Sequence, residues 1–252
     1  MRGNLRGLIG RFLAWTDDWF FPQGVLCLCC DRALSEPVQE SICPACAAAL
    51  EALADRQEES ERNKGKEPLP EGIDYIHSAY PYDAQARTLV HRLKFESIRA
   101  AAAPLARPMA YLCAGEEVLI VPVPTDRLRM MKRGFNQSTL LAEHIARTLG
   151  MPVETALVRI KHRAPQTGLS MERRRSNLSG CMRAKESVRG KRILLIDDVY
   201  TTGATVCEAA RALRAAGATG VGVLTACRAA QNKKEAGDPF SAALFSRVIK
   251  KK

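Results

Sequence analysis

Short apolar runs alternate with segments of helical periodicity from residue 73 onward. Strands are predicted where apolar residues run together, at 118–124, 153–160, 192–196 and 219–228, and a strand pair or hairpin edge is predicted at 73–82. Helices are predicted where apolar residues share one face, at 84–95, 136–150 and 204–218. Strand, helix and strand at this spacing form βαβ units, so the pattern predicts an α/β fold whose largely parallel sheet is flanked by helices.

The first 72 residues have a different pattern. Residues 1–50 combine a short amphipathic N-terminal helix, with Leu5, Leu8 and Phe12 on one face, and a cluster of cysteines. Residues 51–72 begin with a helical pattern and then become charged, with Gly and Pro and few apolar residues, which is typical of a linker. We therefore expect a small module at 1–50, a linker at 51–72, the α/β domain at 73–230 and a basic tail at 231–252.

Composition and charge restrict the class of protein. Of the 252 residues, 46% are hydrophobic and 26% are charged, which is ordinary for a folded domain. The net charge of +11 favours an anionic partner, namely a phosphorylated small molecule, a nucleic acid or an acidic protein. The N-terminus resembles a signal peptide only briefly, because Arg11 interrupts the apolar stretch and Asp17 and Asp18 follow. With no long apolar run, we expect no membrane span and a cytoplasmic protein.

The nine cysteines are unevenly distributed, with five close together near the N-terminus and four scattered singly through apolar stretches. Cys27 and Cys30 form one C-x-x-C pair, and Cys43 and Cys46 form a second. Two such turns bring four thiolates into tetrahedral reach of Zn²⁺. Cys29 is a spare thiol that leaves the assignment of the first pair open, and a redox role is the alternative to metal binding. A structural zinc ribbon is favoured, because protein ligands fill all four positions.

The stretch ILLIDDVYTTGAT, residues 193–205, ends a predicted buried strand on two adjacent carboxylates. Ligands of an open parallel sheet bind at the carboxyl ends of its strands. Asp197 and Asp198 would repel each other there unless cations or hydrogen-bond donors meet them. The vicinal hydroxyls of a sugar, with Mg²⁺ nearby, satisfy both carboxylates.

Residues 201–205, TTGAT, lead from these carboxylates into a predicted helix. A helix N-terminus offers free N–H groups and the positive end of the helix dipole, which together bind phosphate. Gly203 and Ala204 let the backbone approach an anion closely. One short turn therefore suits a ribose 5-phosphate. The simpler alternative is that Asp198 or one threonine only caps the helix. A nucleoside triphosphate site is disfavoured, because G-x-x-x-x-G-K-[ST] does not occur.

This stretch closely resembles the phosphoribosyl-pyrophosphate signature of type I phosphoribosyltransferases. The resemblance extends to VPVPTDRLRMMKRGFNQSTLLA at 121–142, to RLKF at 92–95 and to QTGLSMERRRSN at 166–177. Taken in order over roughly residues 20–228, these motifs are similar to the ComF family (competence protein F, GntX-like). The resemblance implies a type I phosphoribosyltransferase-like sheet with flanking helices, preceded by a small zinc ribbon.

The resemblance also implies roles for individual residues. Asp197 and Asp198 would hold the ribose hydroxyls, and Lys94 would meet the pyrophosphate. Arg133 and Gln137 would lie near a mobile loop over the site. The two aspartates, Lys94 and Arg133 are the candidate catalytic residues. Further substrate contacts are expected from Val199, Tyr200, Thr201, Thr202, Gly203, Ala204 and Thr205.

Other interpretations of the basic residues remain open. Without the resemblance, Arg133 and Gln137 would belong to a solvated helix entry capped by Asn136, and Lys94 would be a surface charge. The basic run at 161–176 is a hood over the substrate, a solvated loop or a phosphate-tracking patch for single-stranded DNA. It lacks the interleaved aromatic residues that stack on bases.

The function implied by the resemblance is a Mg²⁺-dependent displacement of pyrophosphate from C1 of phosphoribosyl pyrophosphate, with an unidentified acceptor. In the family this fold is linked to DNA uptake during competence or to the use of external DNA. Single-stranded DNA and DNA-uptake or helicase proteins are therefore the expected partners. A non-catalytic module that binds single-stranded DNA and a phosphoribosyl-pyrophosphate sensor are the alternatives.

Overall fold

A four-stranded parallel sheet, with the strand order β1-β6-β5-β2, forms the centre of the fold. Its strands are β1 (Tyr75–Pro81), β2 (Leu119–Pro122), β5 (Arg192–Tyr200) and β6 (Gly220–Arg228). The computed structural model describes residues 26–36, 38–63, 68–113, 115, 117–160 and 180–230. The predicted N-terminal helix, the basic run at 161–176 and the tail at 231–252 lie outside the described residues.

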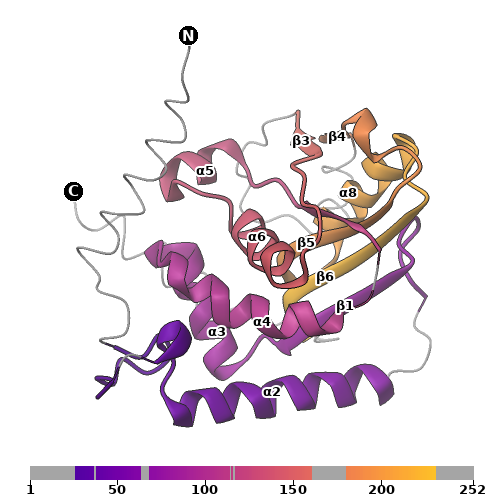
Figure 1. The fold of residues 1–252 in the computed structure, drawn as a ribbon. Helices are drawn as coiled ribbons and strands as arrows, with labels where there is room; N and C mark the ends of the chain where they lie inside the picture. Colours follow the sequence, from indigo (N-terminus) through magenta and orange to yellow (C-terminus); the bar gives the residue numbers. More distant parts are fainter. Residues whose placement is uncertain are drawn as a thin grey trace.

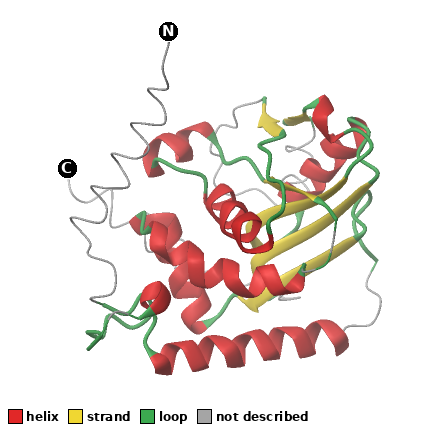
Figure 2. Cartoon of the chain, in the orientation of Figure 1, coloured by secondary structure: helices red, strands yellow, loops and turns green. Residues whose placement is uncertain are grey.

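Helices cover both faces of the sheet (Figures 1 and 2). Alternate residues of β5 divide the core, because successive side chains of a strand point to opposite faces. Leu194 and Ile196 join the apolar cluster of one face, and Ile193 and Leu195 join the cluster of the other. The first face carries α3 (Ala84–His91), α4 (Ala102–Leu112) and α6 (Gln137–Leu149); the second carries α8 (Ala204–Ala215) and the antiparallel pair β3 (Leu157–Arg159) and β4 (Met182–Ala184).

Shorter elements connect these layers. They are η1 (Gln39–Ser41), the π-turn η2 (Arg92–Glu96), η3 (Arg99–Ala101), α5 (Arg127–Arg133) and η4 (Glu186–Val188). The π-turn interrupts the expected helix 84–95 and ends at Ser97, whose φ of 58° lies in the left-handed region. A π-turn projects its side chains differently from a regular helix and is often found at functional sites. Here it carries Lys94.

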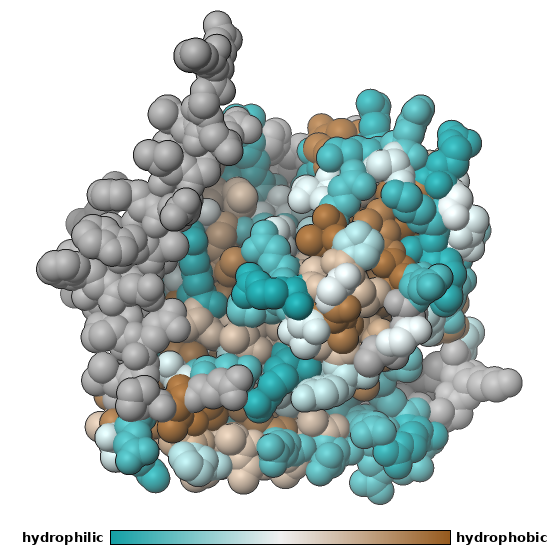
Figure 3. Space-filling view, viewed as in Figure 1, coloured by the Kyte–Doolittle hydropathy of each residue, from teal (hydrophilic) through white to brown (hydrophobic). Residues whose placement is uncertain are grey.

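Both edges of the sheet are covered by other parts of the chain. The long helix α2 (Pro44–Asn63) lies along β1, and Glu61 Oε1 accepts a hydrogen bond from the backbone N–H of Ser78 at 3.2 Å. At the opposite edge, Ile120 of β2 exchanges backbone hydrogen bonds with Pro152 and Glu154. In Figure 3 the C-terminal half of α2 is mainly hydrophilic, whereas apolar side chains are more frequent over its N-terminal half.

The structure confirms the predicted parallel sheet with flanking helices and corrects three local predictions. Residues 73–82 form no hairpin; β1 is a single edge strand that pairs in parallel with β6. The strand predicted at 192–196 extends to Tyr200, because β6 continues to pair with it beyond the two aspartates. The strand predicted at 153–160 is shorter, with β3 beginning at Leu157.

Helix α2 crosses the range 51–72 in which a linker is expected. It runs to Asn63, and its buried residues Leu50 and Leu53 belong to the same apolar cluster as α4 and α6. The division of the chain at residues 50, 72 and 230 stays a prediction. No helix of the described ranges is both long enough and apolar enough to traverse a bilayer.

Candidate functional site

Asp197 and Asp198 lie near the carboxyl end of β5, the position at which an open parallel sheet binds its ligands. Asp198 is 9% exposed, and Asp197 is partly exposed. One oxygen of Asp197, Oδ1, accepts two hydrogen bonds, from the backbone N–H of Asp198 at 2.9 Å and from Ser138 Oγ at 3.0 Å. Ser138 stands in the first turn of α6, so this helix fixes the orientation of the Asp197 carboxyl group.

Lys94 reaches this pair from the π-turn. Its Nζ lies 2.8 Å from Asp198 Oδ1, and both side chains are largely buried. Burial acts to lower the pKa of Lys94, but the charges of Asp198 and Asp197 outweigh it and raise that pKa. The ammonium group is therefore charged and neutralises Asp198. The surface-charge alternative for Lys94 does not describe its environment.

The pKa of Asp197 is raised to about 7, because the surrounding protein removes water from the carboxyl group and because Asp198 is next to it. The hydrogen bonds to Oδ1 and the charge of Lys94 oppose this shift. A carboxyl group with a pKa of about 7 is protonated in only part of the molecules at neutral pH, and a nearby cation or further hydrogen-bond donor favours its charged form. Among the described residues Lys94 forms its ion pair with Asp198, and Asp197 is the carboxyl group that a bound cation would stabilise in its charged form.

The turn after β5 is built around Gly203, which has a φ of +75° and is the N-cap of α8. A Cβ atom at this position would lie 2.5 Å from the hydroxyl oxygen of Tyr200, so both the backbone and the space require glycine. No side chain caps α8, and its N-cap is neither Asp198 nor a threonine. The first N–H groups of α8 thus lack a side-chain cap, and uncapped N–H groups at the start of a helix can bind an anion.

The other expected substrate residues surround this turn. Val199 and Tyr200 belong to β5, where Tyr200 is buried and Val199 is partly buried. Thr201 is exposed, Thr202 is partly exposed, and Ala204 opens α8 with Thr205 next to it. The hydroxyl-bearing residues are thus accessible beside the two carboxylates.

The capping expectation at the start of α6 is confirmed. Asn136 is the N-cap, and its side chain accepts a hydrogen bond from the N–H of Ser138 at 3.2 Å. Gln137, however, is not solvated: it is only 2% exposed, and its Nε2 has no hydrogen-bond partner among the described residues. An unsatisfied buried amide is costly, so Gln137 is a candidate for contact with a ligand.

Arg133 ends α5, and its guanidinium lies over the Phe95 ring, 5.5 Å from the centroid. Burial lowers the pKa of Arg133, the charge of Arg129 lowers it further, and the charge of Asp198 opposes both. Arg133 is therefore within electrostatic reach of the carboxylates. Phe95 belongs to the RLKF motif and Ser138 follows the Asn136 cap, but their contacts could not be predicted from the sequence, because the fold alone brings Phe95 to Arg133 and Ser138 to Asp197.

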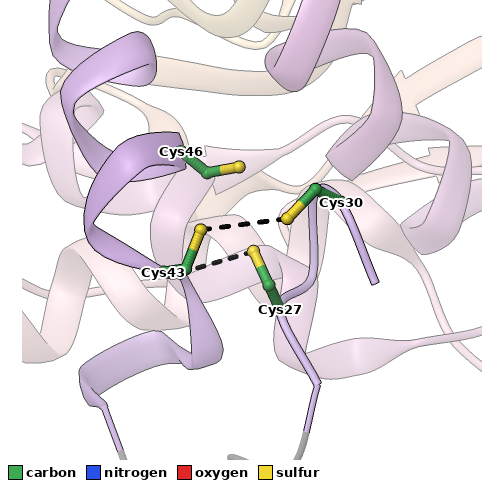
Figure 4. Close-up of side chains that lie close together, drawn as sticks. All are labelled: Cys27, Cys30, Cys43 and Cys46. Carbon is green, nitrogen blue, oxygen red and sulfur yellow. Dashed lines mark hydrogen bonds between the residues drawn. The ribbon is translucent and has the colours of Figure 1, made fainter. Parts of the chain in front are cut away.

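The four cysteines of the two C-x-x-C pairs come together (Figure 4). The sulfur atoms of Cys27, Cys30, Cys43 and Cys46 all lie within 4.8 Å of one another, and those of Cys30 and Cys43 are 3.8 Å apart. The N–H of Cys43 donates to Cys27 Sγ at 3.3 Å. Backbone N–H groups that point at sulfur stabilise thiolates, so this donor set fits Zn²⁺.

Cys29 lies outside this group, which resolves the choice left open by the sequence. Burial raises the pKa of Cys29 to about 12, with a further contribution from the charge of Cys27. For Cys27 itself, burial acts to raise the pKa, but backbone hydrogen bonds from Cys43, Cys29 and Cys30 outweigh it, and the pKa falls to about 6. Cys27 is thus the better thiolate ligand. Four protein sulfurs leave no open coordination position for catalysis.

Comparisons with known proteins find relatives that match most of the chain. The family model described as Phosphoribosyl transferase domain matches residues 136–244. The chain is 35% identical over 214 residues to the DNA utilization protein YhgH of Salmonella typhimurium, covering 81% of this chain and 90% of that protein. It is 31% identical over 200 residues to competence protein ComFC of Bacillus subtilis, covering 76% and 79%. It is 37% identical over 114 residues to competence protein F of Haemophilus influenzae, covering 44% and 50%.

Proposed function

We propose a function from the premise that this chain belongs to the ComF family, which includes the DNA utilization protein YhgH and competence protein F. The chain carries a domain of the phosphoribosyltransferase type. It binds phosphoribosyl pyrophosphate and transfers the phosphoribosyl group to an acceptor. An acceptor nucleophile attacks C1 of the ribose, and the bond from C1 to the pyrophosphate oxygen breaks.

The observation that carries this proposal is the Lys94–Asp198 ion pair, 2.8 Å long, beside Asp197 and the turn before α8. The aspartates hold the two ribose hydroxyls, and the N–H groups and hydroxyls of 201–205 hold the 5-phosphate. Lys94 exchanges Asp198 for the oxygens of pyrophosphate as the sugar hydroxyls arrive. Arg133, whose guanidinium lies over Phe95 next to Lys94 in the chain, supplies a second cation.

The proposed catalysis consists mainly of orientation and charge stabilisation. The leaving pyrophosphate gains negative charge in the transition state, which the ammonium of Lys94 and the guanidinium of Arg133 offset. Mg²⁺, which prefers oxygen ligands and phosphate-bearing substrates, supplies further positive charge to the diphosphate when bound. The carboxylate oxygens of Asp197 and Asp198 are compatible with such an ion. Zn²⁺ on the four cysteines is structural.

Calorimetric titration with phosphoribosyl pyrophosphate and Mg²⁺ tests the sugar site. Asp197→Asn combined with Asp198→Asn should abolish binding while the circular dichroism spectrum stays that of the folded protein. An unchanged affinity in this double variant contradicts the assignment. Pyrophosphate release, measured with single-stranded DNA or free bases as acceptors, then separates a transferase from a sensor, since a sensor binds and releases nothing.

A second candidate function is a DNA-binding module that kept the fold without the chemistry. The names of the relatives, which refer to DNA utilization and competence, and the net charge of +11 favour it. Such a module would bind single-stranded DNA with a strong salt dependence and would not bind the sugar diphosphate. Both functions are compatible with DNA-uptake or helicase proteins as partners.

A further inference from the structure

Phe95 occupies an unusual position on the π-turn. Its neighbours Leu93 and Lys94 are buried or largely buried, whereas 61% of Phe95 is exposed. The Phe95 ring is not part of the apolar core. It contacts polar side chains instead: the His91 ring lies 4.9 Å away between centroids, and the Arg133 guanidinium lies 5.5 Å from the Phe95 centroid.

A second arginine–phenylalanine contact joins the same two segments of the chain. The guanidinium of Arg99 lies 5.0 Å from the centroid of Phe135. The segments 92–99 and 133–135 are thus joined by two reciprocal contacts, in which each segment supplies one arginine and one ring. We call these four residues, Phe95, Arg99, Arg133 and Phe135, the Arg–Phe clasp. The clasp joins the turn that carries Lys94 to the end of α5.

The end of α5 needs such a contact. Helix α5 has only seven residues, none of which is buried, and it ends at Gly134 in the left-handed conformation. Apolar packing therefore does little to hold Arg133 in place. An arginine over an aromatic face is held both by the ring quadrupole and by contact area. The charge of Asp198 acts to raise the pKa of Arg133, against the lowering by burial and by Arg129.

We infer that Phe95 is a positioning residue: its ring holds the Arg133 guanidinium against the π-turn that carries Lys94, so that pyrophosphate meets both cations without first ordering the α5 segment. This inference rests on the proposed function for the identity of the anion. It assigns to the exposed ring an indirect role in substrate binding, through Arg133.

Limited proteolysis without ligand tests the contact itself. Trypsin cleaves after Arg133 when the end of α5 opens. Phe95→Leu keeps an apolar side chain but removes the π face, and cleavage after Arg133 should become about two- to five-fold faster. Phe95→Tyr keeps the face and should be cleaved at the wild-type rate. Tyr111→Leu, which removes a ring that is 78% exposed on α4, is the matched control and should also show the wild-type rate.

Calorimetry with inorganic pyrophosphate and Mg²⁺ tests the consequence for the anion. The affinity of Phe95→Leu should fall about two- to five-fold, and the affinities of Phe95→Tyr and Tyr111→Leu should not change. Wild-type cleavage and wild-type pyrophosphate affinity in Phe95→Leu overturn the inference. An equal loss in Phe95→Tyr also overturns it, because the aromatic face would then not be the active feature.

Failure of the proposed function gives a different result. In that case the wild-type protein binds no phosphoribosyl pyrophosphate, while trypsin still cleaves Phe95→Leu faster than Phe95→Tyr. That outcome contradicts the sugar site and supports the Phe95–Arg133 contact. A wild-type protein that binds the sugar diphosphate, together with a Phe95→Leu variant that behaves as wild type in both assays, contradicts only the inference.

Discussion

Arg92 Nη2 donates a hydrogen bond to Asp31 Oδ1 at 2.6 Å, and the Arg92 side chain is only 12% exposed. Asp31 directly follows Cys30 and has a φ of 58°. Arg92 opens the π-turn on which Lys94 stands. This ion pair therefore ties the cysteine cluster to the turn that supplies a cation to the candidate sugar site. The cysteine cluster and the candidate sugar site differ in chemistry, but the Arg92–Asp31 ion pair connects them.

Asp31→Asn should weaken anion binding although Asp31 is not near the sugar site. The substitution keeps the shape of the side chain and removes the charge-assisted hydrogen bond, which contributes ~1 kcal/mol because Asp31 is largely exposed. We expect a few-fold lower affinity for pyrophosphate by calorimetry, with the zinc content unchanged. Glu58→Gln breaks the exposed Arg62–Glu58 pair of the same 2.6 Å length and is the control. Equal effects of the two variants would contradict a specific role of Asp31.

Cys43→Ser should lower the zinc content to well under one ion per chain and lower the melting temperature. The reason is that three sulfurs and a hydroxyl bind Zn²⁺ much more weakly than four sulfurs. Cys29→Ser is the matched control, because Cys29 lies outside the four-sulfur group and should leave the metal in place. Metal analysis by mass spectrometry measures both. Full occupancy in Cys43→Ser would show that Cys43 is not a ligand.

The raised pKa of Asp197 predicts a pH-dependent cost in stability. Between the ordinary aspartate pKa near ~4 and the folded value of about 7, the native state binds more protons than the unfolded state. The free energy of unfolding therefore falls as the pH rises through this window. Asp197→Asn cannot ionise, so it should melt at about the wild-type temperature at pH 5 and at a higher temperature at pH 8.

Asp198→Asn is the contrasting variant for the same measurement. It leaves the largely buried ammonium of Lys94 without its carboxylate partner, so we expect a lower melting temperature at pH 8. A melting temperature of Asp197→Asn that runs parallel to wild type from pH 5 to pH 8 would refute the raised pKa.

Gly203→Ala should both destabilise the protein and impair phosphate binding. Alanine pays ~1 kcal/mol for the left-handed backbone, and its Cβ collides with the hydroxyl of Tyr200. Gly150→Ala is the control, because its φ is +65° but no atom lies within 4 Å of the added Cβ. Chemical denaturation should show a larger loss for Gly203→Ala than for Gly150→Ala. Adding Tyr200→Phe to Gly203→Ala should recover part of the lost stability, because it removes the hydroxyl that the new Cβ meets. If no stability is recovered, the collision with this hydroxyl is not the cause of the loss.

Much of the sheet could be predicted from local pattern alone. The apolar runs that became β2, β5 and β6 are buried on both faces, and such runs are unmistakable in a parallel sheet. The ends of these strands were less predictable. Two charged residues in sequence indicate the end of a buried strand, yet β5 continues through Asp197 and Asp198 because β6 supplies backbone partners up to Arg228.

The candidate site depended on contacts that no local pattern contains. Lys94 and Asp198 are far apart in the chain and meet only because the π-turn lies over the end of β5. The burial of Gln137 and the hydrogen bond from Ser138 to Asp197 arise from the packing of α6 on the sheet. The choice of Cys27 over Cys29 likewise depended on how the loop folds around the four sulfurs.

The covered edges of the sheet have a consequence for assembly. A strand from another molecule joins a sheet only where backbone N–H and C=O groups are free, and here Glu61 of α2 and the backbone at 152–154 already occupy such groups on the two outer strands. A partner that cannot use these groups would bind through side chains on the helices and loops. These contacts at Ser78 and Ile120 hinder the extension of the sheet by a further strand at those two positions.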